Sequence, residues 1–400
     1  MSHLYKAEPN SYDAFGRLRV ANPVTLFDSA NRYKVHGKFN TYTSGTASVV
    51  FDNNTSVVNM TVGTAAGDKV YRETNRVFSY QPGKSLLILT TFTFPANQTN
   101  LRCRAGYFST SNGIFTQRNG DGISFVRRSN PTGTPVDFEV HQQDWLYDKL
   151  DGNGPSGYTL DLSKSQIFWT DIEWLGVGSV RCGFVIDGKF IHCHSFHHAN
   201  HIEATYMQTA CLPVRYEIEN VGVTASSATL KQICATVITE GGYEIAGKPH
   251  SFSMPINAPR TLAIAGEGYP VIAIRLKPNR LDAIAAPIGF SVLGITSANY
   301  RYRLVKSTTL TGGTWVSAGD DSNVEYNITA TSATVGEELA AGYFSTTNQS
   351  SGSVNNVPDL FRYQLERNSF TGEALTFAII VSSGTANNTV AASIDWQEIT

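Results

Sequence analysis

The stretch IFWTDIEWLGVGSVRCGFVIDGKFIHCHSFHHANH, residues 167–201, decides the fold that this sequence predicts. Its first nine residues alternate in the manner of a β-strand, because successive strand side chains point to opposite faces. Trp169, Asp171 and Glu173 therefore share one face of the predicted strand. The opposite face receives Phe168, Thr170, Ile172 and Trp174.

Two further strands follow, joined by a hairpin. Residues 180–186 and 190–196 are apolar runs, and Asp187-Gly188 between them tolerates the positive backbone angles of a tight turn. An isolated hairpin is only marginally stable in water. These strands must therefore lay an apolar face on a second sheet, which predicts a β-sandwich.

Length and composition extend this prediction to the whole chain. Its 400 residues are enough for two domains, Gly, Ser, Thr, Asn, Tyr and Phe are abundant, and helical periodicity is scarce. We expect an all-β protein of two antiparallel, jelly-roll-like β-sandwiches, with one short helix near residues 336–341. Only 16% of the residues are charged and the net charge is −2, so no basic surface for nucleic acid or a membrane is indicated.

The cysteines and the apolar runs restrict the expected environment of the protein. Five cysteines without a CxxC spacing predict buried free thiols, rather than a disulfide framework or a thiolate zinc site, at Cys103, Cys182, Cys193, Cys211 and Cys234. Residues 1–16 lack an apolar core of signal-peptide length, and no apolar run reaches the ~18 residues of a membrane helix. We therefore expect synthesis in a reducing cytoplasm, without membrane insertion.

Composition divides the chain into an N-terminal arm and two domains. Residues 1–22 are polar without a strong period, and the glycine-rich stretch at Gly241-Gly242 separates the domains 23–240 and 241–400. The strands expected in the first domain, besides those of residues 167–196, are 48–51, 57–62, 85–94, 101–108, 122–126, 213–223 and 229–238. Those expected in the second domain are 271–276, 288–293, 300–305, 314–317, 360–366, 375–381 and 391–399, with Pro278 and Pro287 outside them.

The arm contains an aromatic and basic cluster made of Tyr12, Phe15, Arg17, Leu18 and Arg19. A segment of this composition cannot form a core of its own, so it docks on its own domain or on a neighbouring chain. A strand that completes the first sandwich is an equally consistent interpretation. Of these, we expect contacts between chains or with another protein of the same assembly.

One internal repeat is visible, because AGYFSTSN at residues 105–112 recurs as AGYFSTTN at residues 341–348. It indicates either two related β-sandwiches or independent use of the same turn residues. Turn-forming residues recur so often that we favour independent use.

Five of the nine histidines are close together, at His192, His194, His197, His198 and His201. On a strand His192 and His194 would face the same side, a spacing that can hold a transition metal, with His198, His201 or Glu203 as a third ligand. Spacing alone is a weak signal, and zinc prefers a tighter, closed set of ligands. We predict no structural zinc and no cofactor here, with His192, His194 and His198 as the weak candidates for a metal.

The strand that carries the carboxylates resembles the catalytic strand of laminarinase-type retaining β-glucanases, which are concanavalin-like jelly rolls. The resemblance rests on FWTDIEWLG at residues 168–176, where that family has the pattern Glu-x-Asp-x-Glu. It implies a helper role for Asp171 and an acid/base role for Glu173, and it places Trp169 at the nucleophile position. Retaining hydrolysis needs two carboxyl groups about 5 Å apart, one of which attacks the sugar, and tryptophan cannot attack. The resemblance therefore implies the fold and argues against an enzyme.

Two shorter motifs agree with such a jelly roll. NGDGISF at residues 119–125 resembles the GDG strand of lectin-like sandwiches, and VIDGKFI at residues 185–191 resembles the VDGK hairpin of laminin-G-like domains. Together these resemblances cover about residues 80–225 and imply a concanavalin/laminin-G-like first domain.

A broader resemblance spans most of the chain. DAFGRLRVANPVTLFDSANRY, WLGVGSVRCGF, LFRYQLERNSFTG and ASIDWQEI are similar to a family of virion structural proteins of tailed bacteriophages, especially those of aquatic bacteria and cyanobacteria. The resemblance implies a component of the tail, fibre, baseplate or capsid surface, located in the virion and made in the host cytoplasm. Such proteins form closed symmetric oligomers, so the implied partners are further copies, in a trimer or higher ring, and other virion proteins.

The leading alternative is a glycan-binding module that recognises the host surface, which is compatible with a place in a virion. Trp169 would stack on a sugar ring, while Asp171 and Glu173 would accept hydrogen bonds from its hydroxyl groups. If loops or a partner chain covered this face, a glycan could not reach it. A working glycosidase is the least favoured interpretation, because the nucleophile position is lost.

Overall fold

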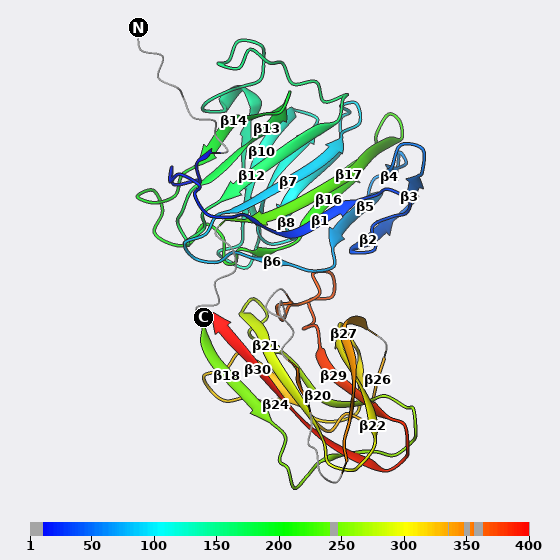
Figure 1. Cartoon of the computed structure of the whole chain (residues 1–400). Helices are drawn as coiled ribbons and strands as arrows, with labels where there is room; N and C mark the ends of the chain where they lie inside the picture. The colour runs from blue at the N-terminus through cyan, green and yellow to red at the C-terminus, as the bar shows by residue number, and fades with distance from the viewer. Residues whose placement is uncertain (1–10, 241–246, 335, 348–352, 356–362, 400) are drawn as a thin grey trace. The chain divides into compact units, whose positions relative to one another are not determined.

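The computed structural model describes residues 11–240, 247–334, 336–347, 353–355 and 363–399. The chain divides into two compact units, Met1–Gly242 and Tyr243–Thr400 (Figure 1). The prediction of an all-β protein is confirmed, because the described residues form antiparallel sheets and contain no α-helix. In this described part of the chain there is accordingly no helix long and apolar enough to span a membrane.

The first unit contains two large antiparallel sheets. The eight-stranded sheet has the spatial order β14 (Lys189–Phe196), β13 (Val180–Ile186), β12 (Gln166–Ile172), β7 (Leu86–Thr93), β17 (Ala228–Thr239), β4 (Val57–Val62) and β3 (Ser48–Asp52), with β1 (Val24–Ala30) also paired to β17. The seven-stranded sheet has the order β11 (Val136–His141), β10 (Gly122–Ser129), β9 (Gly113–Asn119), β8 (Leu101–Phe108), β16 (Val214–Asn220), β5 (Lys69–Thr74) and β2 (Phe39–Ser44). Outside these sheets lie the short pair β6 (Phe78–Ser79) and β15 (Cys211–Leu212) and the 3-10 turn η2 (Gln142–Asp144).

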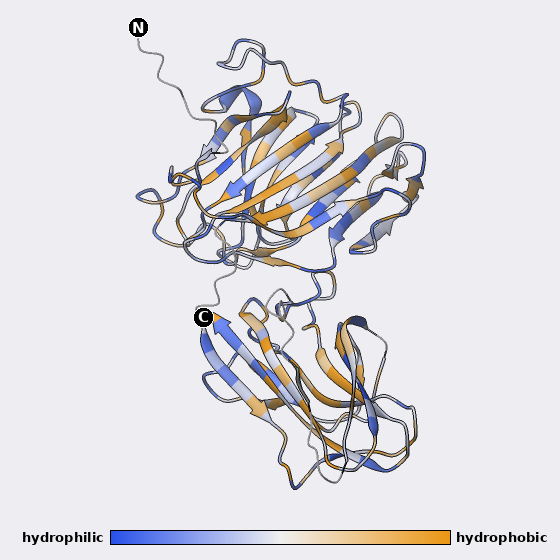
Figure 2. Cartoon of the chain, in the orientation of Figure 1, coloured by the Kyte–Doolittle hydropathy of each residue, from blue (hydrophilic) through white to orange (hydrophobic). Residues whose placement is uncertain are grey.

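Alternation along the strands builds the core of the first unit. In β12 the side chains of Phe168 and Ile172 join the core, so Trp169 and Asp171 face the outer side of the eight-stranded sheet. Figure 2 shows the same alternation as bands of apolar and polar residues along the strands. In β8 the core side chains are Leu101, Cys103, Ala105 and Tyr107.

The second unit is built from two smaller antiparallel sheets around its own core, in which Trp396 is fully buried. One sheet has the order β18 (Lys248–Ser253), β30 (Asn388–Ile399), β21 (Ile284–Gly294) and β28 (Ser353–Asn355), with β19 (Arg260–Leu262) also paired to β30. The other has the order β24 (Val316–Ser317), β25 (Val324–Asn327), β20 (Tyr269–Leu276), β29 (Phe377–Ser383), β22 (Asn299–Lys306) and β27 (Glu337–Ser345). A separate short pair joins β23 (Leu310–Thr311) and β26 (Ser332–Ala333).

The prediction of a short helix at residues 336–341 is wrong. These residues lead into and form part of β27, which pairs with β22 so that Ala341 lies opposite Arg303. A helix of one or two turns is not stable by itself, because its nucleation is costly. Pairing with β22 supplies hydrogen-bond partners for the backbone, and the tertiary context therefore decides the conformation.

Two further strand predictions need correction. Pro287 lies inside β21 rather than outside the strands, at a bulge between Pro287 and Gly289, where a missing backbone donor is tolerated. The strand expected at residues 360–366 begins in residues that the structure does not describe, and within its described part Leu365 forms an isolated bridge with Ala285.

The repeated AGYFST segments have different environments in the two units. Tyr107 of the first copy is fully buried in the core, whereas its counterpart Tyr343 is 79% exposed. Asn348, the last residue of the second copy, lies outside the described residues. The contrast favours independent use of similar residues over duplication.

Candidate functional site

Residues 11–20 of the arm form a small hairpin that closes on itself. The amide of Asp13 donates to the carbonyl oxygen of Arg17 at 2.9 Å. The Asp13 carboxylate accepts hydrogen bonds from the amides of Phe15 and Arg17, each at 2.9 Å. Gly16 takes the positive φ of 75° that the turn requires. These local bonds give the arm a defined shape.

The two arginines of this hairpin meet two carboxylates at the end of β12, Asp171 within the strand and Glu173 directly after it. Arg17 Nη2 lies 2.6 Å from Glu173 Oε1, and Arg19 Nη2 lies 2.9 Å from Asp171 Oδ2. The arginines and the carboxylates are each two positions apart, so alternate side chains of one extended segment match alternate side chains of the other. The arm cluster and the carboxylates, predicted separately, thus form one site, which we call the arm site.

Two more charged residues complete the arm site. Arg181 Nε donates to Asp171 Oδ2 at 3.0 Å, and the Arg181 guanidinium also donates to the carbonyl oxygen of Tyr12. Arg19 Nη1 lies 2.6 Å from Glu240 Oε1. Asp171 is therefore fixed by two guanidinium groups, one from its own sheet and one from the arm.

Glu173 is held less firmly than Asp171. It pairs with Arg17, whose side chain is 52% exposed, and its Oε2 accepts a hydrogen bond from the Tyr80 hydroxyl at 3.1 Å. Burial raises the pKa of Glu173 to about 7, and the Arg17 charge offsets this only in part. Burial and the neighbouring Glu173 also raise the pKa of Tyr80, so the phenol remains a donor. Glu173 therefore changes its charge near neutral pH.

Trp169 is buried beside the arm site, with 1% of its surface exposed. Its ring lies 5.6 Å from that of Phe190, and the guanidinium carbon of Arg181 lies 5.7 Å from its centroid. A Cβ atom on Gly183 would lie 2.8 Å from the indole nitrogen and 1.9 Å from the carbonyl oxygen of Ile191. Only glycine therefore fits opposite this tryptophan.

Retaining glycoside hydrolysis needs two carboxyl groups, one of which attacks the sugar. In the arm site two guanidinium groups engage Asp171, and the residue to which the resemblance assigns the nucleophile position is Trp169. Trp169, Asp171 and Glu173 are all buried: the arm covers the two carboxylates, and Phe190, His192 and Arg181 of the neighbouring strands lie against Trp169. Glycan binding by these three residues stays a prediction, for a form in which the arm is displaced.

His192 and His194 were expected to share a strand face, and that prediction is wrong. A bulge in the pairing of β13 with β14 shifts the register between them. His192 lies on the outer side, 6.0 Å from the Trp169 ring, whereas His194 packs at 4.8 Å against Phe196 of the core. Burial lowers the pKa of His192 to about 3 and that of His194 to about 4, so both rings are neutral at pH 7.

His198 is also engaged in packing. Its Nδ1 lies 2.5 Å from the carbonyl oxygen of Gly178, and its ring stacks on Tyr206 at 3.8 Å. Burial lowers its pKa to about 4. Among the described residues, no group of three or more His, Cys, Asp or Glu side chains is arranged to hold a metal ion.

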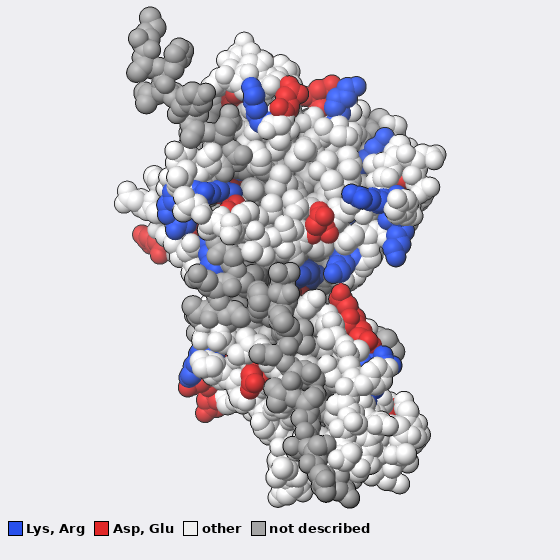
Figure 3. Space-filling view, in the orientation of Figure 1, with Lys and Arg blue, Asp and Glu red and all other residues white. Residues whose placement is uncertain are grey.

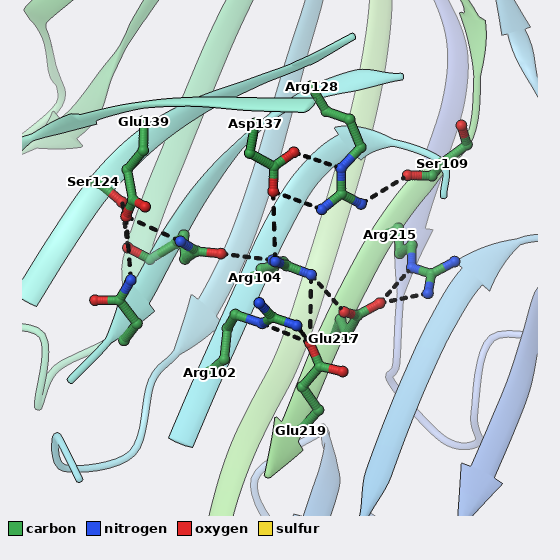
Figure 4. Close-up of polar contacts among 12 residues, drawn as sticks. Arg102, Arg104, Ser109, Ser124, Arg128, Asp137, Glu139, Arg215, Glu217 and Glu219 are labelled. Carbon is green, nitrogen blue, oxygen red and sulfur yellow. Dashed lines mark hydrogen bonds and ion pairs between the residues drawn. The ribbon is translucent and has the colours of Figure 1, made fainter. Parts of the chain in front are cut away.

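A second charged cluster covers the outer face of the seven-stranded sheet (Figure 4). Arg104 Nη1 lies 3.0 Å from Glu217 Oε1, and Arg215 pairs with Glu217 and, at 2.9 Å, with Glu73. Sequence reasoning did not identify this cluster. We call it the sheet-face cluster, and it comprises Lys69, Glu73, Arg102, Arg104, Asp137, Arg215, Glu217 and Glu219.

The centre of the sheet-face cluster, made of Glu73, Arg104, Arg215 and Glu217, is buried, whereas Lys69, Arg102 and Asp137 at its edge are partly exposed. The guanidinium carbon of Arg215 lies 3.7 Å from the centroid of the Tyr71 ring. Burial alone would raise the pKa of Glu217, but Arg215, Lys69 and Arg104 hold it well below its usual range. The sequence did contain a signal for this cluster, because charged residues alternate in two of the predicted strands. It does not show, however, that these two strands are neighbours in the sheet.

Elsewhere the charged side chains are scattered, and Figure 3 shows a largely uncharged face on the first unit. In the second unit a cleft of about 620 Å³ is lined in part by Trp315 and Leu281. The guanidinium carbon of Arg275 lies 4.1 Å from the Trp315 centroid and covers one face of that ring. The arm site and the sheet-face cluster are thus the two charge clusters on which we base a function.

No known protein-family model and no curated protein matches the sequence. Among solved structures, the carbohydrate recognition domain of Emp47p is similar at 11% identity and a TM-score of 0.36, over 55% of this chain and 97% of that chain. The β-glucanase of Bacillus licheniformis is similar at 10% identity and a TM-score of 0.35, over 53% of this chain and 96% of that one. Lectin II from Ulex europaeus is similar at 10% identity and a TM-score of 0.33, over 54% and 98%. At these values the similarities carry no argument about function.

Proposed function

We propose that this protein is a non-catalytic structural component of a virion. The virion location rests on the resemblance of four segments, DAFGRLRVANPVTLFDSANRY, WLGVGSVRCGF, LFRYQLERNSFTG and ASIDWQEI, to virion structural proteins of tailed bacteriophages. The arm site is the observation that supports a non-catalytic role. There Asp171 and Glu173 are buried and paired with Arg19 and Arg17, while Trp169 stands where a nucleophile is needed.

The proposed mode of action is assembly into a symmetric homo-oligomer, a trimer or a higher ring, beside other virion proteins. The arm supports this, because Phe15, Leu18 and Val20 are 44%, 57% and 83% exposed in a single chain. Burying apolar surface of this kind stabilises a contact by about 25 cal/mol per Å². A neighbouring protein that covers the arm would supply that burial.

Labelling of particles tests the proposal. Gold-conjugated antibodies against the purified protein are applied to intact particles of the virus that encodes it, and electron microscopy locates the gold. We expect label at repeated, symmetry-related positions on the tail, baseplate or capsid. Particles that lack the protein, from host cells that contain it, would contradict the proposal.

Glycan binding is the second candidate function. The observation in its favour is that Trp169, Asp171 and Glu173 lie together at one face, and that side-chain charges of the arm meet the two carboxylates there. A glycan array probed with the wild type and with the Arg17→Glu/Arg19→Glu double variant tests it. We expect binding by the double variant, lost when Trp169→Ala is added. Binding that a folded Trp169→Ala chain keeps unchanged would place the glycan elsewhere.

A further inference from the structure

The arm is attached to the first unit mainly through charged side chains. Arg17 reaches Glu173 at 2.6 Å, and Arg19 reaches Asp171 at 2.9 Å and Glu240 at 2.6 Å. The backbone hydrogen bonds within residues 11–19 close the hairpin of the arm itself instead of extending either sheet. The arm is therefore a preformed ligand of the first unit and not one of its strands.

The arm borders an open cleft, and the segment that connects it to the sheet is exposed. A cleft of about 340 Å³ is lined by arm residues on one side and by residues 83–85 and Glu240 on the other. Residues 20–23, which join the arm to β1, are exposed, and the apolar side chains of Phe15 and Leu18 face solvent. Because Phe15, Leu18 and Val20 of the arm remain exposed while Arg17 and Arg19 are paired, we attribute most of the docking free energy to charge pairing.

We propose that the arm site is a docking site for an Arg-x-Arg hairpin, and that during assembly this hairpin is the arm of a second copy of the chain. Its two carboxylates, two positions apart, match two arginines with the same spacing. Arg181 adds a hydrogen bond to the hairpin backbone at Tyr12. The arm already makes this set of contacts, so the arm of a second copy presents the same ligand. The inference deepens the proposed function and rests on it for the identity of the partner.

Exchange of arms between two copies replaces each contact with an identical one, so the contacts favour neither arrangement. The concentration of the chain therefore decides whether a site holds its own arm or the arm of a second copy. A short tether holds the arm near its own site at an effective concentration on the order of millimolar. A dilute chain therefore keeps its own arm, whereas chains crowded at an assembling particle exchange arms, as in domain swapping. The exposed residues 20–23 are the hinge that such an exchange requires.

A peptide-binding experiment with full-length chains tests the docking site. In the Arg17→Glu/Arg19→Glu chain, the acidic arm is repelled and the site is free. A dye-labelled peptide SYDAFGRLRV, residues 11–20, is titrated with each chain and followed by fluorescence anisotropy. We expect the double variant to bind it at least about tenfold more tightly than the wild type, whose own arm competes.

Two controls accompany the titration. The peptide with both arginines replaced by glutamine should bind neither chain. The Lys164→Glu/Lys189→Glu chain has the same change of net charge at two exposed positions away from the arm site and should behave as the wild type. Failure of a folded Arg17→Glu/Arg19→Glu chain to bind the wild-type peptide would overturn the docking site.

A mixing experiment tests the second copy. The Asp171→Asn/Glu173→Gln chain keeps its arm but lacks the charged site, and the Arg17→Glu/Arg19→Glu chain keeps the site but lacks a competent arm. We expect light scattering to show pairs of the two chains in the mixture and no pairs of either chain alone. If circular dichroism shows that Asp171→Asn/Glu173→Gln is unfolded, Glu173→Gln replaces it, and the pairs then form less completely.

The outcomes test the docking site and the identity of its partner separately. Peptide binding without pairing of folded chains would overturn the second copy as the partner, and the site would serve an Arg-x-Arg segment of another protein. Particle labelling is independent of both experiments. Labelled particles together with unpaired chains would leave the virion function standing and reject this contact.

Discussion

The two charge clusters of the first unit combine the same side chains in different ways. In the sheet-face cluster, Arg104 and Arg215 hold Glu217, and all three belong to strands of one sheet. In the arm site the sheet contributes Asp171 and Arg181, while further cations come from a segment outside the sheet. The same guanidinium–carboxylate pairing is therefore a permanent part of the fold in one place and a separable contact in the other.

The protonation of two glutamates follows from this difference. Glu217 faces Arg215, Lys69 and Arg104, which hold its pKa well below the usual range in spite of burial. Burial raises the pKa of Glu173 to about 7, because Arg17 is its nearby cation and is half exposed. A buried carboxylate thus keeps its charge at lower pH when several buried cations surround it than when its nearby cation is half exposed.

The largest effect is expected from Arg215→Met in the sheet-face cluster. The substitution leaves Glu73 and Glu217 buried with one cation fewer, which should lower the free energy of unfolding by about 3–5 kcal/mol. Urea denaturation measures the loss. The control is Arg102→Met, whose side chain is 33% exposed and should contribute no more than about 1 kcal/mol. If both variants lost the same free energy of unfolding, the buried pairs of Arg215 would be no more stabilising than the partly exposed pair of Arg102.

Deletion of residues 1–20 should have a smaller effect on the stability of the first unit. Asp171 keeps Arg181, and Glu173 can take up a proton, so the expected loss is below about 2 kcal/mol. The melting temperature of the monomer should be nearly unchanged, while light scattering should show weaker assembly. If the deletion unfolds the monomer, the arm belongs to the first core.

The pH dependence of stability should differ in sign for Glu173 and Glu217. The folded pKa of Glu173 is raised from 4.5 to about 7, so its contribution to the free energy of unfolding is present below pH 4.5 and is lost as pH rises to about 7. The folded pKa of Glu217 is lowered, so its contribution is present above its ordinary pKa and is lost on acidification.

Urea denaturation between pH 4 and pH 8 checks this prediction. Glu173→Gln should flatten the fall in stability between about pH 4.5 and pH 7, whereas the exposed control Glu203→Gln should leave it unchanged. An unaltered slope in Glu173→Gln would assign that titration to another group.

The smallest effect on stability is expected from salt. Raising NaCl from about 0.05 to 0.5 M screens the partly exposed Arg17 pair and should change the free energy of unfolding by less than about 0.5 kcal/mol. The arm should nevertheless be released more often, so trypsin should cut after Arg17 and Arg19 several times faster. Cleavage after the buried Arg104 provides the control. Cleavage of the arm at a salt-independent rate would mean that charge does not hold it.

Local pattern was enough to predict much of the fold. The strands Val57–Val62, Leu101–Phe108 and Val180–Ile186 have the predicted bounds, because each is a run of mainly apolar or alternating apolar and polar residues. The common face of Trp169 and Asp171 was also predicted, since alternation is a property of the strand alone. The bulge between His192 and His194 was not, because it arises in the pairing with a neighbouring strand.

The arm site shows where such prediction ends. Arg17 with Arg19, and Asp171 with Glu173, were each identified as pairs two residues apart. Nothing local joins them, because Arg17 and Glu173 are 156 positions apart in the chain. The matched spacing of opposite charges was available in the sequence, but only the fold shows that the two segments are neighbours.

The separation between Arg19 and Glu240 also bears on how the chain is made. These partners are 221 positions apart, and β1, next to the arm, pairs with the end of β17 just before Glu240. A ribosome adds roughly 5–20 residues per second, so about 10–45 s pass between the emergence of the arm and that of its last partner. Throughout this interval the nascent chain carries an arm with no completed site of its own. On one messenger, the arm of a nascent chain therefore has time to dock on the completed site of a chain ahead of it before its own site exists.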